Sequence, residues 1–210
     1  MKHIRTFCLI GAFLFLLSSG RAYPQGSQSN KRQFRTLVNR AAGFTVQYQG
    51  TLIERGQNEF LIKLQQPGSA GNGEGRVHIF VSQQPFVYLP GTYGGRFYFE
   101  TDKTPNTAAD HVRGDSVTVN GIRFARDYWA VYAGMGQWET VDNCYTIHGG
   151  RCYTISLTRN FKTVMPGQTV NGTRTTKEQL RSSLIGKMRD TSNVNVKSFN
   201  ELLKSFSITK

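Results

Sequence analysis

The sequence lacks the short motifs that mark the common enzyme classes. It contains no Gly-x-Ser-x-Gly elbow, no His-Glu-x-x-His pair and no glycine loop of the phosphate-binding type. Only three histidines follow residue 22, namely His78, His111 and His148. No catalytic residue is therefore identified, and we expect a protein that is not an enzyme and needs no cofactor.

Acidic residues are also scarce. The chain has 13 Asp and Glu against 26 Lys and Arg, which gives a formal charge of +13. Such an excess favours anionic partners, namely nucleic acid, acidic polysaccharide or lipid head groups, but says nothing about fold. A basic surface without such a partner is the alternative, because many exported proteins are basic.

No apolar run reaches the length of a membrane span. The longest extends from Phe7 to Leu17, about half of the roughly 20 residues that a spanning helix needs. Lys2 and Arg5 precede it, and small residues lead to Ala22, which is the pattern of a secretory signal peptide. We predict a signal peptide over 1–22, cleavage near Ala22 and an exported chain, secreted or periplasmic, with a charge of +10 because three cations and no acid are removed.

Two cysteines follow the predicted cleavage site, in the stretch "CYTIHGGRCYTI" from Cys144 to Ile155. His148 lies between Cys144 and Cys152, but a zinc site would need a fourth ligand and the stretch is a poor helix former, so we expect no metal. A redox pair would be spaced more closely. We predict a disulfide across a hairpin in which Cys144 faces Cys152, because this register keeps the apolar side chains on one face.

Strand patterns occupy most of the chain after a polar leader, residues 23–33, that we expect to be disordered. Apolar residues alternate with polar ones over 44–48 and 76–83, and hairpins are predicted over 51–66, at Asn120-Gly121 and over 137–160. Residues 105–113 could form a short helix. Residues 34–210 are expected to form a single α+β domain, an antiparallel sheet flanked by helices.

The C-terminal region changes to helical spacing. Leu180, Leu184 and Met188 recur on one helical face, and Thr175 with Glu178, and Ser198 with Glu201, match capping boxes. Cations outside the apolar stripe could form a ridge that binds phosphate or sulfate groups, with an ordinary solvated helix face as the alternative. The anion-binding candidates are Arg174, Lys177, Arg181, Lys187 and Arg189. Asn171 begins a glycosylation sequon, which matters only in a eukaryotic secretory route.

The two ends of the mature chain resemble the PsbP-like family. The motifs are "NRAAGFTVQYQG", from Asn39, and "ELLKSFSI", from Glu201, with Gln49 where the family usually has Pro. The resemblance implies an α/β/α sandwich around an antiparallel sheet. It also implies a non-enzymatic binding or assembly factor, as members are in photosystem II or on a Ran-type GTPase.

Three functions follow from these observations. The leading hypothesis is an exported binding or assembly module of unknown ligand and partner. The second is a binder of anionic polymer or lipid head groups that uses the basic C-terminal helix. The third is a hydrolase that uses His78 or His111, which would require one of them to lie in a cleft beside a carboxylate.

Overall fold

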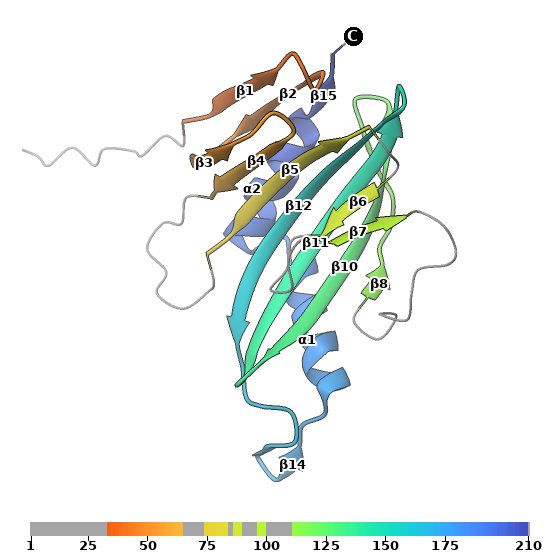
Figure 1. Ribbon diagram of the computed structural model, residues 1–210. Helices are drawn as coiled ribbons and strands as arrows, with labels where there is room; N and C mark the ends of the chain where they lie inside the picture. Colours follow the sequence, from red (N-terminus) through yellow and green to blue (C-terminus); the bar gives the residue numbers. More distant parts are fainter. Residues whose placement is uncertain (1–32, 65–73, 84–85, 90–95, 100–110, 210) are drawn as a thin grey trace, which may run out of the picture. The chain divides into compact units, whose positions relative to one another are not determined.

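The computed structural model describes residues 33–64, 74–83, 86–89, 96–99 and 111–209, and its central element is an eight-stranded antiparallel sheet (Figure 1). The strands along it follow the order β3-β4-β5-β12-β11-β10-β8, and β9 pairs with the start of β10. Their bounds are β3 Thr51–Arg55, β4 Glu59–Lys63, β5 Arg76–Ser82, β8 His111–Arg113, β9 Val117–Val119, β10 Ile122–Gly134, β11 Gln137–His148 and β12 Arg151–Lys162.

The described residues also form three smaller sheets. A three-stranded sheet has the order β1-β2-β15, with β1 Arg35–Asn39, β2 Phe44–Tyr48 and β15 Ser207–Ile208. The chain also forms the hairpins β6–β7, with β6 Phe86–Leu89 and β7 Arg96–Phe99, and β13–β14, with β13 Thr169–Val170 and β14 Thr173–Arg174. β15 joins segments from the two ends of the described chain, because it pairs with β2.

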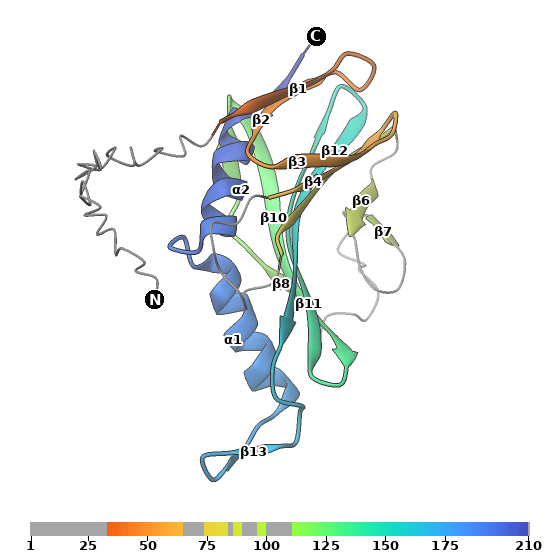
Figure 2. The ribbon, with the colours of Figure 1, turned by 90° about the vertical axis from the view of Figure 1, so that its left-hand side faces the viewer.

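Two helices cover one face of the large sheet, and the β6–β7 hairpin lies against the other (Figure 2). Helix α1, Lys177–Arg189, packs on β10 and β11, and α2, Val194–Ser205, packs on β2, β9 and β12. We call the side under α1 and α2 the helix face, and the opposite side the outer face. This arrangement confirms the predicted α+β class, an antiparallel sheet flanked by helices. Neither helix is long and apolar enough to cross a membrane, within the residues that the structure describes.

The main apolar core lies on the helix face. Phe206 is 1% exposed and contacts the rings of Phe44, Phe124 and Tyr153, whose centroids lie 5.4 to 6.0 Å away. A second cluster joins Leu184, Ile185 and Met188 of α1 to Tyr128, Ala130 and Trp138 of the sheet. The alternating strand patterns predicted for β2 and β5 are confirmed, because their apolar residues are buried.

The predicted helix starts need correction. α1 is capped by Thr176, whose hydroxyl accepts from the Gln179 amide at 3.1 Å, so the capping box lies one residue beyond Thr175 and Glu178. α2 is capped by Asn193, so Ser198 and Glu201 lie inside the helix rather than at its start. The helix suggested for 105–113 is wrong for His111–Arg113, which is strand β8, and the rest of that segment lies outside the described residues.

The hairpin of β11 and β12 has a different register from the predicted one. Cys144 lies opposite Ile155 and Cys152 opposite Ile147, around a tight turn at Gly149 and Gly150, both with positive φ. Because side chains alternate along a strand, Cys144 points into the helix-face core and Cys152 points to the outer face. Both thiols are free and buried, so the predicted disulfide between them is wrong in this structure.

The reason lies in the burial of both faces. The register prediction assumed that one face of the hairpin is exposed, so that apolar residues must share the other. Residues 140–146 and 152–159 are all buried, on both faces of the sheet. With both faces covered, the distribution of apolar residues no longer selects the register, and the two-glycine turn decides it.

Candidate binding pocket on the outer face of the sheet

A row of polar side chains crosses the outer face of the sheet. Asp127 on β10 lies opposite Asn143 on β11, Asn143 opposite Ser156 on β12, and Ser156 opposite His78 on β5. We call these four residues the polar row. Directly opposite residues of an antiparallel pair point to the same face, so the row forms one line across four strands.

The middle of the polar row is completely buried. Asn143 and Ser156 are both 0% exposed, and the Ser156 hydroxyl donates to Asn143 Oδ1 at 2.6 Å. Among the described residues, the Asn143 amide nitrogen has no hydrogen-bond partner, and neither has the hydroxyl of Thr158 farther along β12. Leaving a buried donor without an acceptor costs about 1–3 kcal/mol.

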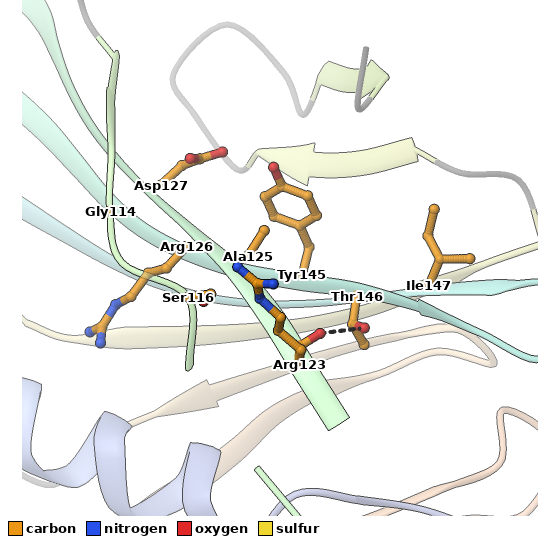
Figure 3. A pocket seen from close by; sticks show the side chains of 9 residues that line it. All are labelled: Gly114, Ser116, Arg123, Ala125, Arg126, Asp127, Tyr145, Thr146 and Ile147. Atoms are coloured by element: carbon orange, nitrogen blue, oxygen red, sulfur yellow. Dashed lines mark hydrogen bonds between the residues drawn. The ribbon is translucent and has the colours of Figure 1, made fainter. Parts of the chain in front are cut away.

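A pocket of about 500 Å³ opens beside the polar row, at the end where β10 separates from β11. Ala125 forms its floor, and Arg123 and Asp127 lie on the same face of β10, two residues to either side (Figure 3). Tyr145, opposite Ala125 on β11, forms a wall with its ring. The pocket therefore brings a guanidinium, a carboxylate and an aromatic ring together around a small side chain.

Gly114 positions the rim of the pocket. Its amide donates to the Arg126 carbonyl at 2.7 Å, which holds the connection between β8 and β9 against β10. A Cβ at this position would lie 2.6 Å from the Tyr128 ring and 3.0 Å from the Arg126 carbonyl oxygen. Only glycine allows this approach, so the rim depends on a backbone contact.

The far end of the pocket is fixed by a side-chain hydrogen bond. Backbone pairing between β10 and β11 begins at Ala125 and Tyr145, and β10 pairs with β9 before that point. Thr146, one residue farther along β11, donates its hydroxyl to the Arg123 carbonyl at 2.8 Å (Figure 3). This bond ties the two diverging strands together and sets the direction in which Arg123 leaves the strand.

A buried ion pair supports the pocket from the helix face. Arg126 donates to both carboxylate oxygens of Asp142, at 2.8 and 2.5 Å, and to Asn200 on α2 at 3.3 Å. Burial raises the pKa of Asp142, and the bonds from Arg126 oppose that rise. Burial also lowers the pKa of Arg126, but the hydrogen bond and charge of Asp142 outweigh it and leave that pKa above its ordinary value.

The predicted anion-binding residues do not form one ridge. Arg174 lies in β14 before the helix, Lys177 is the first residue of α1, and Arg181 is half-buried. Lys187 leans over Phe161 of β12, whereas Arg189 leans over Tyr128 of β10, so these two cations lie on opposite flanks of α1. The structure therefore separates the five candidates into a group near the start of α1 and two isolated cations near its end.

The predicted histidines lie apart from the pocket. His78 has 17% of its side chain exposed, and its Nδ1 lies 3.8 Å from Glu59 Oε1. Burial, and then the charge of Arg76, lower the pKa of His78 to about 4. His148 is exposed beside the glycine turn, and the side chain of His111 lies outside the described residues.

The thiols are not arranged for metal binding. Cys144 and Cys152 point to opposite faces, and no group of three or more His, Cys, Asp and Glu that could hold a metal occurs in the described parts of the chain. Burial raises the pKa of the Cys144 thiol well above its ordinary value, which keeps it protonated.

The sequence reasoning missed the pocket residues Arg123, Asp127 and Tyr145. A signal was present, because Arg123, Ala125 and Asp127 alternate along a predicted strand and must share a face. The contact of Gly114 with β10 had no local signal, since it joins residues that pair only in the folded chain.

Comparisons with known proteins give only distant structural similarities. No protein-family model matches the chain, and no curated protein is significantly similar to it. Three solved structures share part of its arrangement at low identity, and their TM-scores are too low to bear on function. A Bacteroides thetaiotaomicron crystal structure has a TM-score of 0.44 and 13% identity, over 85% of this chain and 49% of that one. This chain thus spans about half the length of the Bacteroides protein.

The other two structures come from Saccharomyces cerevisiae and from Synechocystis. The Saccharomyces cerevisiae Ran-binding protein Mog1p has a TM-score of 0.42 and 8% identity, over 85% of this chain and 97% of its own. The cyanobacterial PsbP (CyanoP) from Synechocystis has a TM-score of 0.34 and 11% identity, over 89% of this chain and 99% of its own. The resemblance of the two chain ends to the PsbP-like family therefore stays a prediction, and the α+β arrangement rests on the structure of this chain.

Proposed function

We propose that the protein is a non-enzymatic binding module that takes a small zwitterionic ligand in the outer-face pocket. One observation carries the proposal: Arg123 and Asp127, of opposite charge, flank Ala125 in a pocket of about 500 Å³. A cavity of this size, with few polar groups of defined position, is typical of a small-molecule site.

The charges define the class of ligand. The exposed Arg123 guanidinium matches a carboxylate, and the Asp127 carboxylate accepts hydrogen bonds from an ammonium group. The small side chain of Ala125 leaves room between them, and the Tyr145 ring offers an apolar wall for a side chain of the ligand. A short peptide with free ends, or an amino acid, satisfies all four contacts.

The hydrolase hypothesis has less support. Ser156 lies opposite His78, but its hydroxyl hydrogen is directed to Asn143 Oδ1 at 2.6 Å and is not available to a base on β5. Glu59 lies 3.8 Å from His78, beyond hydrogen-bond distance. The polar row therefore favours binding over acyl transfer.

Binding of peptides tests the proposal. A panel of dipeptides with free ends is titrated into the protein by isothermal calorimetry. We expect binding by the wild type and a loss of at least about tenfold in Arg123→Gln, in Asp127→Asn and in Ala125→Leu, whose larger side chain occupies the space between the two charged groups.

The matched control is Arg40→Gln, which removes an exposed cation from the turn between β1 and β2. It should bind like the wild type. Dipeptide binding that survives all three pocket variants, or its absence from the wild type, contradicts the proposal.

Export is part of the same proposal and rests on residues 1–22, which lie outside the described residues. The disulfide no longer supports it, because both thiols are free. Mass measurement of the protein recovered from its native compartment tests it, with an N-terminus near Tyr23 as the expected result.

A further inference from the structure

A second surface, far along β10 and β11 from the pocket, presents three exposed apolar side chains on two loops. Met135, in the turn between β10 and β11, is 86% exposed. Val164 and Met165, at the start of the segment between β12 and α1, are 36% and 44% exposed. We call these three residues the apolar tip.

Hydrogen bonds hold the two loops side by side. The Thr163 amide donates to the Gly136 carbonyl at 2.8 Å, which places Met135 next to the start of the second loop. A Cβ on Gly136 would lie 2.3 Å from the Thr163 carbonyl oxygen, so this contact requires glycine. Within the second loop, the Gln168 amide donates to the Met165 carbonyl at 3.1 Å. The tip is thus a preformed surface.

Met135 has an unusual backbone conformation for its side chain. Its φ is +48°, in the left-handed region that glycine and asparagine adopt at much lower cost. The turn at Asn120-Gly121 uses asparagine in the same conformation, with φ of +48°. Because the Met135 side chain is 86% exposed, it adds apolar surface at this position and little buried packing.

Cations outnumber acids around the apolar tip. Residues 163–176 contain no Asp or Glu, and the acids next to the two loops are Glu139 on β11 and Glu178, the second residue of α1. Lys162, Arg174 and Lys177 are exposed and belong to the strands and helix that border the two loops. The Arg174 guanidinium lies beside Gly167, two residues after Met165. A side chain at that glycine would place its Cβ 3.7 Å from the guanidinium. The cations therefore border the apolar side chains.

From this arrangement we infer that the apolar tip docks on the surface of an anionic lipid bilayer. Lipid head groups attract the cations, and the three side chains enter the boundary with the acyl chains. An anionic polymer in water would pair with the cations but would leave the apolar side chains exposed, and the tip has no aromatic ring for base stacking. A bilayer is the anionic partner that uses both features.

Flotation with vesicles tests the inference. The probe is a vesicle of phosphatidylcholine and phosphatidylglycerol in equal parts, compared with phosphatidylcholine alone. We expect binding to the anionic vesicles only, weakened about fivefold by each of Lys162→Gln and Arg174→Gln. Met135→Asn with Met165→Gln, which keeps the backbone conformation at 135, should weaken binding about tenfold.

Controls come from exposed residues elsewhere in the chain. Ile53→Thr removes an exposed apolar side chain from β3, and Lys197→Gln removes an exposed cation from α2. Both should float like the wild type, and circular dichroism should show all variants folded.

Three results would overturn the inference. The first is an absence of flotation with anionic vesicles. The second is binding to heparin and vesicles that depends on the cations but is unchanged by the apolar substitutions, which would identify an anionic polymer. The third is a dimer in sedimentation velocity that Met135→Asn with Met165→Gln dissociates, which would identify a second copy of the chain as the occupant.

Discussion

The two faces of the large sheet are both buried, but they solve the problem of buried polar groups in different ways. On the helix face, Arg126 and Asp142 pair through two hydrogen bonds inside an apolar core. On the outer face, the polar row keeps Asn143 and Ser156 at 0% exposure, and the Asn143 amide nitrogen has no hydrogen-bond partner among the described residues. The helix face therefore buries a pair of opposite charges, whereas the outer face buries neutral polar groups beside a pocket.

The largest expected effect on stability comes from breaking the ion pair on the helix face. Arg126→Met leaves the Asp142 carboxylate, 1% exposed, without its partner, and we expect a loss of about 3–5 kcal/mol in the free energy of unfolding measured in urea. The double variant Arg126→Met with Asp142→Leu should recover most of the loss, because both charges are gone. Equal destabilisation in the single and double variants would mean that the pair matters only for packing.

A pH dependence comes from the outer face. The pKa of His78 falls from 6.5 in the unfolded chain to about 4 in the folded protein. The unfolded chain therefore binds the proton first, so stability is complete above pH 6.5 and decreases as the pH falls to about 4, by about 3 kcal/mol. Because carboxylates titrate in the same range, the difference between wild type and His78→Gln is measured by urea unfolding at several pH values. A constant difference contradicts the lowered pKa.

A smaller effect is expected for the middle of the polar row. Asn143→Leu with Ser156→Ala removes one hydrogen bond and one unsatisfied donor together, so we expect a change within about 1 kcal/mol. The comparison with Arg126→Met distinguishes the two faces directly. A loss as large as that of Arg126→Met would show that the outer face is as important for stability as the helix face.

The smallest effect concerns the thiols, one on each face. Since Cys144 and Cys152 are free, a reducing agent should leave the thermal midpoint unchanged, whereas a disulfide across so short a loop would contribute about 2.5 kcal/mol. Mass spectrometry after alkylation of the denatured protein, without reduction, should find both cysteines modified. Unmodified cysteines would restore the predicted disulfide and require another register.

Much of the fold could be predicted where one side of an element is exposed. The alternation in Phe44–Tyr48 and Arg76–Ser82 was clear for that reason, and Asn120-Gly121 indicated its hairpin through the positive φ that both residues adopt. The register of Cys144 was not predictable in this way, because burial on both faces removes the alternation.

The pocket was not predictable for a different reason. Its rim depends on Gly114, whose role is a close approach to the Arg126 carbonyl and the Tyr128 ring. A glycine that allows such an approach looks the same in sequence as one in any loop. A strand pattern assigns each side chain to one face of the strand. It does not show which distant segment packs on that face, because that contact forms only in the folded chain.

The pairing of β15 with β2 has a consequence for how the chain folds. The Ser205 hydroxyl oxygen accepts from the Gln47 amide at 2.8 Å, across a separation of 158 residues. Contacts of such separation form slowly, because a long loop must close before they stabilise anything. During synthesis β2 therefore emerges early and keeps an unpaired edge until β15 is made. In this interval the unpaired edge exposes the nascent chain to aggregation.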